Sequence, residues 1–208
     1  MKVAIIGIGN MGTGFAKSLD KTKHQVFIGS RNIEKAKEMA QSLGNSQGGS
    51  YKDAAGFADV IILAAPWHSM KDVLNALGDV SGKVLVDICN PLTKDFSGLD
   101  VGFTTSAAEE IAKIVPGAKV VKAFNTIFAE VLQSSHKFEE GLADVFICGD
   151  DKDAKEMVSE LARDSGYEPV DCGALSAARW LEPLGMLNIN LGYMQKMGAK
   201  IAFRLMRK

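Results

Sequence analysis

KVAIIGIGNMG, residues 2–12, is an apolar stretch of strand length that runs directly into the glycine pattern GxGxxG. The next apolar residues, which include Phe15 and Leu19, recur with helical spacing. A strand, a glycine turn and a helix in this order predict the first unit of a dinucleotide-binding fold, in which backbone N–H groups approach a pyrophosphate. We therefore expect the loop to bind a cofactor through Gly7, Ile8, Gly9, Asn10, Met11 and Gly12.

Apolar runs of strand length alternate with segments of helical period along most of the chain. Strands are expected at residues 2–6, 25–28, 59–65, 83–88, 119–124, 144–148 and 168–171. Runs such as Val60–Ala65 have no polar alternation, which is typical of strands covered on both faces. Helices are expected at 11–19, 33–43 and 151–163 and after Ser106, which forms a capping-box pattern with Glu109. The sequence predicts an α/β fold of the Rossmann type with a doubly wound, mainly parallel sheet.

The residues that follow the second expected strand indicate which dinucleotide binds. NAD-binding domains usually have an acidic residue here, which holds the ribose 2′-OH. In this chain Gly29 is followed by Ser30 and Arg31, and Lys35 comes about one helical turn later. A hydroxyl, a guanidinium and an ammonium group suit a 2′-phosphate. We therefore expect NADP(H), bound through Ser30, Arg31 and Lys35.

Composition excludes several classes of protein. The 208 residues include 24 Lys and Arg against 25 Asp and Glu, and a net charge of −1 argues against a nucleic-acid partner. No apolar run is long enough for membrane insertion. The three cysteines include no CxxC pair, so reduced thiols and a cytoplasmic location are expected. His24, His68 and His136 lack HExxH spacing, so no metal is expected.

The sequence does not decide the roles of several polar residues near the ends of the expected strands. Asn90 and Asn125 could hold an amide or carbonyl group of a ligand, or could simply make turns. His68 is interpreted as a loop histidine near the cofactor. Residues 44–48 match GxSxG but follow a helix rather than a strand, so they are interpreted as a loop and not as a nucleophile elbow. No acid–base constellation is visible, and the catalytic residue is unknown.

Several motifs taken together resemble those of NADPH-dependent reductases of the deazaflavin coenzyme F420. The resemblance covers essentially the whole chain, and the domain is also similar to the cytoplasmic NADPH-binding part of membrane ferric reductases. The motifs are at residues 7–12, 29–31, 65–67, 106–109, 148–151, 181–184 and 187–189.

The resemblance implies hydride transfer between NADP(H) and C5 of the deazaflavin. It adds Ala65, Pro66, Trp67 and Asn90 to the expected cofactor-binding residues. It implies an acceptor pocket formed by Pro91, Leu92, Asn125, Thr126, Ile127, Leu184, Leu187 and Asn188. This chain departs from the family pattern at Ile8, where the family often has Thr, and at Asn125, where its F420 reductases have His. The second departure leaves the identity of the acceptor open.

Chain length favours a flat second cofactor as the substrate. Residues 1–174 are expected to form the NADP-binding Rossmann domain. Residues 175–208 are expected to form a helical segment that contributes to the acceptor pocket and to a homodimer contact. A contact with a second subunit is expected because the apolar residues of this segment exceed one helix face. So short a segment is too small for a helical substrate domain. The leading hypothesis is an NADP-dependent oxidoreductase that uses coenzyme F420 or a flavin. The alternatives are a small NADPH-dependent ferric, flavin or imine reductase, and a non-catalytic NADP-sensing module.

Overall fold

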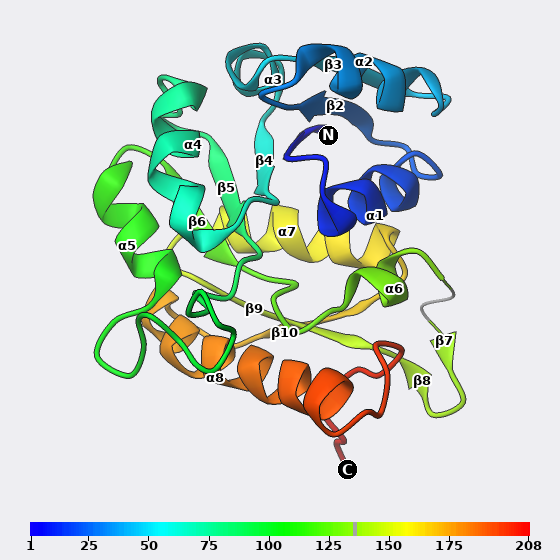
Figure 1. The fold of residues 1–208 in the computed structure, drawn as a ribbon, viewed down its shortest axis with the longest axis vertical. Helices are drawn as coiled ribbons and strands as arrows, with labels where there is room; N and C mark the ends of the chain where they lie inside the picture. Colours follow the sequence, from blue (N-terminus) through cyan, green and yellow to red (C-terminus); the bar gives the residue numbers. More distant parts are fainter. Residues whose placement is uncertain (135–136) are drawn as a thin grey trace.

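The computed structural model describes residues 1–134 and 137–208, and His136 therefore lies outside the described residues. A mainly parallel sheet runs through the molecule in the strand order β10-β9-β6-β5-β4-β1-β2-β3 (Figure 1). Its strands are β1 (Lys2–Ile6), β2 (Gln25–Gly29), β3 (Ser46–Gly49), β4 (Val60–Leu63), β5 (Val84–Asp87), β6 (Lys119–Lys122), β9 (Asp144–Gly149) and β10 (Glu168–Asp171). Among the neighbouring strands of this sheet, only β6 and β9 pair in antiparallel orientation. The Rossmann-type fold is confirmed.

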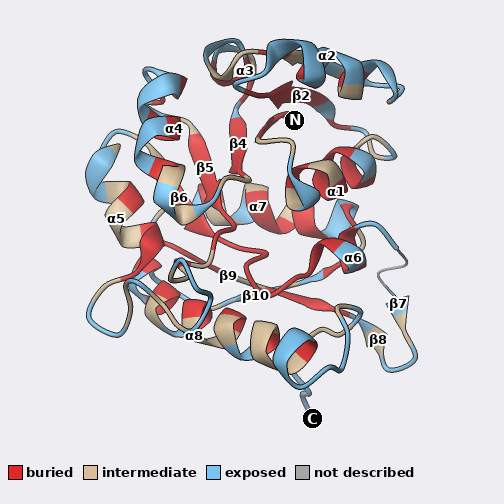
Figure 2. Cartoon of the chain, in the orientation of Figure 1, coloured by how far each residue is buried: buried red, intermediate tan, exposed pale blue. Residues whose placement is uncertain are grey.

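Helices cover both faces of this sheet. They are α1 (Asn10–Leu19), α2 (Ile33–Gln41), α3 (Tyr51–Phe57), α4 (Met70–Leu77), α5 (Ala107–Ile114), α6 (Ala129–Leu132), α7 (Lys152–Asp164) and α8 (Ala178–Ile189). In β1, Val3 and Ile5 join the hydrophobic cluster beneath α1, α2 and α7, whereas Ala4 and Ile6 join the cluster beneath α3, α4 and α5. Both faces of the strand are therefore buried, which explains its continuous apolar sequence (Figure 2).

Side-chain caps fix the starts of several helices. Asn32 accepts a hydrogen bond from the backbone N–H of Lys35 at the start of α2. Ser106 accepts one from Glu109 at the start of α5, which confirms that capping position. Asp151 caps α7 from just outside the helix. No helix of the described part is long and apolar enough to cross a membrane.

One edge of the sheet differs from the sequence expectation. Part of the GxSxG stretch, interpreted as a loop, forms the edge strand β3 and pairs with β2. This strand reads SQGG, without the β-branched or aromatic residues that signal a strand. At Gly48 a Cβ would lie 2.3 Å from the carbonyl oxygen of Ala36, so the glycine permits close packing of α2. The following helix, α3, begins with a capping box between Ser50 and Asp53.

The C-terminal segment is helical only in its first part. A 3-10 turn (Leu175–Ala177), α8 and a π-helical turn (Asn190–Met194) follow one another, and residues 195–208 have no regular secondary structure. Lys196 and Gly198 have positive φ angles of 60° and 84°, which end the helical path. The tail then runs beside β9, where the backbone N–H of Asp144 donates to the carbonyl of Phe203. The expectation of a helical segment is therefore correct for about its first half.

Candidate active site

The three glycines of the first loop meet different physical requirements. Gly7 has a φ of 116°, and a Cβ there would lie 2.4 Å from the carbonyl oxygen of Ala64. At Gly12 a Cβ would lie 2.0 Å from the carbonyl oxygen of Gly7. A Cβ at Gly9 would meet nothing within 4 Å. Gly7 and Gly12 therefore hold the turn together, while Gly9 faces open space at the N-terminus of α1, where a pyrophosphate is favoured.

A first cleft of about 560 Å³ extends from this loop to the carboxyl ends of β2 and β3. Ile8, Ser30 and Arg31 line it, as does Lys52 of α3. The Ser30 hydroxyl is buried and accepts a hydrogen bond from the backbone N–H of Asn32 at 3.1 Å, which fixes its position. A hydroxyl and two cations at this end of the cleft suit a phosphate monoester on a ribose.

The positions of two lysines near this cleft differ from the sequence expectation. Lys35 lies exposed in the first turn of α2 and is not among the residues that line the cleft. Lys52, which the sequence reasoning missed, lines it instead. The missed signal is the SYKD sequence of residues 50–53, whose capping box begins α3 and places Lys52 beside the cleft.

A second cleft of about 530 Å³ continues from the first one. Gly9, Ala64, Ala65 and Pro66 line both, so the clefts meet at the glycine loop and the end of β4. The predicted residues that line the second cleft also include Asn10, Met11, Trp67, Asn90, Leu92, Asn125, Thr126, Ile127 and Asn188. This cleft lies outside the carboxyl ends of parallel strands, where ligands bind in open α/β sheets.

Helix α8 presents one face to the second cleft. Gly185, Asn188 and Ile189 line it, at the i, i+3 and i+4 spacing of a helical face. Leu184 and Leu187 project from other faces of the helix and do not line the cleft, and Leu187 is 48% exposed.

Three aromatic residues of the cleft were not predicted from the sequence, whereas Pro91, which was predicted, does not line it. Pro91 is buried and is not among the lining residues. Phe96, Phe128 and Tyr193 line the cleft and make it strongly aromatic. The rings of Phe128 and Tyr193 pack edge to face, with centroids 5.3 Å apart. Aromatic and apolar walls of this kind suit a flat ring.

Asn90 and Asn125 form a reciprocal pair in the wall of the second cleft. The Asn125 amide nitrogen donates to Asn90 Oδ1 at 2.9 Å and to the carbonyl of Leu181 at 2.7 Å. The Asn90 amide nitrogen donates to the carbonyl of Asn125 at 2.8 Å. Since backbone carbonyls can only accept, these bonds fix both amide orientations. A Cβ at Gly185 would lie 2.4 Å from Asn90 Oδ1, so α8 reaches the pair because this residue is glycine. The pair therefore ties the ends of β5 and β6 to α8.

The ionisable side chains of the second cleft do not form an acid–base pair. Those among the described lining residues are Cys89, Glu130 and Tyr193. Burial raises the pKa of the Cys89 thiol well above its ordinary value. Burial and, to a smaller extent, Glu130 raise the pKa of Tyr193. His68 contacts Asp100 at 3.4 Å and lines neither cleft. The arrangement is suited to orienting rings rather than to moving protons.

Within residues 1–134 and 137–208 no group of His, Cys, Asp and Glu is arranged to hold a metal ion. The site thus consists of a glycine loop, a phosphate-binding end and an adjoining aromatic cleft. These features define a dinucleotide-binding protein of the Rossmann class.

Comparison with known proteins gives the family. The family model described as "NADP oxidoreductase coenzyme F420-dependent" matches residues 2–91. The F420-dependent NADP reductase of Methanothermobacter thermautotrophicus is 34% identical, over 92% of this chain and 89% of that protein. A solved structure of a candidate F420-dependent NADP reductase from Arthrobacter sp. FB24 has a TM-score of 0.90 and 30% identity over the full length of both chains. The chain belongs to the family of F420-dependent NADP oxidoreductases.

A second group of relatives is longer. The metalloreductase STEAP3 of Rattus norvegicus is 35% identical over 89% of this chain. The match spans only 37% of the length of STEAP3.

Proposed function

We propose that the protein transfers a hydride between NADP(H) and coenzyme F420. The observation that carries this proposal is the continuity of the two clefts at Gly9 and Ala64–Pro66. A dinucleotide that binds along the first cleft would bring its nicotinamide to this junction. A planar ring in the second cleft would then lie beside it. The names of the family relatives that match nearly the whole chain support F420 as that ring.

The residues of the first cleft fit the phosphates of NADP(H). Ser30 and Arg31 would bind the 2′-phosphate, with Lys52 as a second cation. Gly9 and the N-terminal N–H groups of α1 would bind the pyrophosphate. Anchored at both groups, the nicotinamide would be held in one orientation at the junction, which lowers the entropic cost of the reaction.

The second cleft supplies positioning rather than proton transfer. The chemistry moves a hydride between C4 of the nicotinamide and C5 of the deazaflavin, and it needs no side-chain acid or base at either carbon. The raised pKa values of Cys89 and Tyr193 agree with this role, because both groups stay protonated near neutral pH. The apolar walls would exclude water from the reacting carbons.

A parallel assay of acceptors tests the proposal. NADPH oxidation is followed with F420, FMN, FAD, ferric chelates and pyrroline carboxylate at equal concentrations. We expect the highest kcat/KM with F420. Faster turnover of ferric chelates would favour the second candidate, a metal reductase, which the similarity to STEAP3 motivates. Tight NADPH binding without turnover of any acceptor would favour the sensing module.

We also propose that the protein is a homodimer through α8 and the following turn. Trp180, Tyr193, Met194 and Met197 are more than half exposed there, which is unusual for large apolar side chains on a monomer. Residues 175–208 would thus serve as an acceptor-side and dimer segment beside an NADP-binding domain of residues 1–174. Light scattering tests this: a stable mass of about 22 kDa across micromolar concentrations would exclude the dimer. The three free cysteines fit a reducing compartment such as the cytoplasm.

A further inference from the structure

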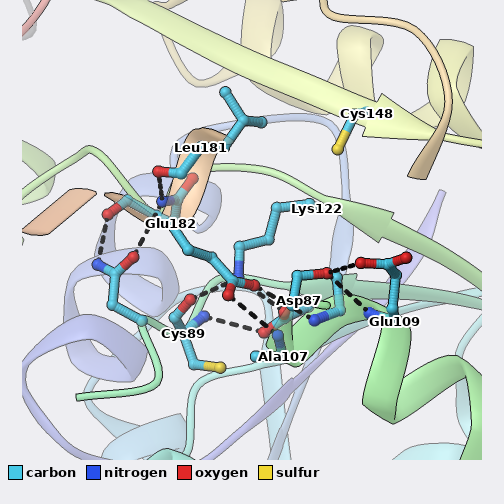
Figure 3. A network of polar contacts seen from close by, with 12 residues as sticks. Asp87, Cys89, Ala107, Glu109, Lys122, Cys148, Leu181 and Glu182 are labelled. Carbon is cyan, nitrogen blue, oxygen red and sulfur yellow. Dashed lines mark hydrogen bonds and ion pairs between the residues drawn. The ribbon is translucent and has the colours of Figure 1, made fainter. Parts of the chain in front are cut away.

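A fully buried ionic cluster lies behind the wall of the second cleft. Figure 3 shows its side chains and their polar contacts. Lys122 Nζ lies 2.8 Å from Asp87 Oδ2 and 2.8 Å from Glu182 Oε1. Its third hydrogen bond, at 2.6 Å, goes to the carbonyl oxygen of Cys89. All three side chains of this cluster have no solvent-exposed surface. The ammonium group is therefore fully satisfied, and the cluster joins β5, β6 and α8.

The hydrogen bonds of the cluster all run from donors to the two carboxyl groups, as expected for carboxylates. Asp87 Oδ1 accepts from the backbone N–H of Cys89, and Glu182 accepts from the backbone N–H groups of Ala107 and Ala108 at the start of α5. Each hydrogen-bond partner of either carboxylate is a donor, so neither has an acceptor for a carboxyl proton. Burial raises the pKa of Glu182 and the nearby Asp87 adds to this shift, whereas Lys122 and the backbone N–H of Ala107 oppose it.

The cluster therefore carries two negative charges against one positive charge. Burial opposes ionisation of Lys122, but the neighbouring carboxylates raise its pKa, so it stays protonated. The nearby Glu109 does not change this balance, because Arg179 forms an ion pair with it at 2.6 Å. The N-terminus of α5 offsets part of the excess, since a helix N-terminus carries about half a positive charge. A net negative charge remains among side chains that have no solvent-exposed surface.

This cluster is connected to the second cleft through a residue that lines the cleft and through the neighbour of one of its own members. Cys89, whose backbone N–H and carbonyl both bond to the cluster, is itself a lining residue of that cleft. Leu181, which precedes Glu182, accepts the hydrogen bond from Asn125, another lining residue. The cluster thus contacts the wall of the second cleft, which adjoins the junction where the nicotinamide would lie.

We propose that Asp87 and Glu182, held around Lys122, form an anionic cluster that stabilises the oxidised, positively charged nicotinamide relative to the reduced, neutral one. The inference rests on the proposed placement of the nicotinamide at the cleft junction. When the hydride leaves C4 with both electrons of the C–H bond, the ring gains a positive charge. A fixed negative charge in a low-dielectric wall lowers the free energy of that state without reorganisation.

The test compares the affinities of NADP⁺ and NADPH. In Glu182→Gln, which keeps the shape of the side chain and removes its charge, we expect the ratio of the Kd for NADP⁺ to the Kd for NADPH to rise about three- to tenfold. Asp87→Asn is expected to shift the ratio in the same direction and decides the question if Glu182→Gln does not fold. Titration by calorimetry or fluorescence at constant salt measures both constants, without any acceptor.

Glu109→Gln is the matched control, because it removes a carboxylate from the start of α5 whose charge is already paired. We expect it to leave the ratio unchanged. Equal weakening of NADP⁺ and NADPH in Glu182→Gln and Asp87→Asn would show a purely structural role and would overturn the inference. So would an equal shift in the control. Since the ratio is independent of the acceptor, failure of F420 turnover would refute the proposed function while leaving this result valid.

Discussion

Replacing Gly9 by alanine separates cofactor binding from folding. Gly9 has φ −73° and ψ −173°, an extended conformation that alanine adopts freely, and its new Cβ would meet no protein atom within 4 Å. Alanine is a poorer helix N-cap than glycine, but it reduces the entropy of the unfolded chain, and the two effects are each below about 1 kcal/mol. We therefore expect the melting temperature of Gly9→Ala to stay within about 4 °C of the wild type.

The effect on NADPH binding should be much larger. The open space beside Gly9 is where the pyrophosphate would approach the N-terminus of α1. A methyl group there costs about 1–3 kcal/mol of overpacking, and a displaced pyrophosphate loses a charge-assisted hydrogen bond worth about 1.5–3 kcal/mol. Together these predict a loss of at least 2.5 kcal/mol, or roughly seventyfold or more in Kd. Calorimetric titration with NADPH, alongside thermal unfolding, measures both quantities.

Gly12→Ala provides the contrast. Its Cβ would lie 2.0 Å from the carbonyl oxygen of Gly7, so the turn itself must move, and unfolding should occur at a clearly lower temperature. If Gly9→Ala binds NADPH with wild-type affinity, the loop is only a structural turn. If it unfolds as readily as Gly12→Ala, the assignment of Gly9 to the open side of the loop is wrong.

Three further predictions concern the cofactor, the acceptor and pH. Arg31→Ala should weaken NADPH binding roughly ten- to a hundredfold and leave NADH binding nearly unchanged, as titration of both cofactors would show; an equal loss for both would exclude the 2′-phosphate role. Gly185→Ala would place a Cβ 2.4 Å from Asn90 Oδ1 and should lower F420 turnover about fivefold more than NADPH affinity, which steady-state kinetics and titration would compare. Burial lowers the pKa of His24 below its ordinary value of 6.5, so the unfolded chain binds a proton that the folded chain resists. The free energy of unfolding should therefore decrease as the pH falls below about 6.5, and His24→Gln should flatten this dependence in denaturant titrations at several pH values.

The sequence predicted the centre of the sheet well because its signal is physical and local. Both faces of β1 and of β4 are buried. Successive residues of these strands are therefore apolar, and that continuous apolar run is visible in the sequence. The caps at Asn32 and Ser106 were also predictable, because one side chain and a backbone N–H three residues later suffice.

The edge strand and the adjoining helix were missed because tertiary contacts decide them. β3 is glycine-rich since α2 packs closely on Gly48, and no propensity indicates that contact. Without α3, the position of Lys52 beside the first cleft could not be inferred. The buried cluster was hidden for a related reason: Asp87, Lys122 and Glu182 lie far apart in the chain, and strand register and helix packing bring them together.

The way in which α8 is held explains how one helix can form a wall of the second cleft. Glu182 bonds to Lys122 and the start of α5, and the carbonyl of Leu181 bonds to Asn125. The absence of a side chain at Gly185 brings the same helix against the asparagine pair. A single helix, fixed at three consecutive points along one face, can therefore supply the wall that larger dehydrogenases build from a separate domain. Any change that loosens one of these points should alter the second cleft before it alters the first.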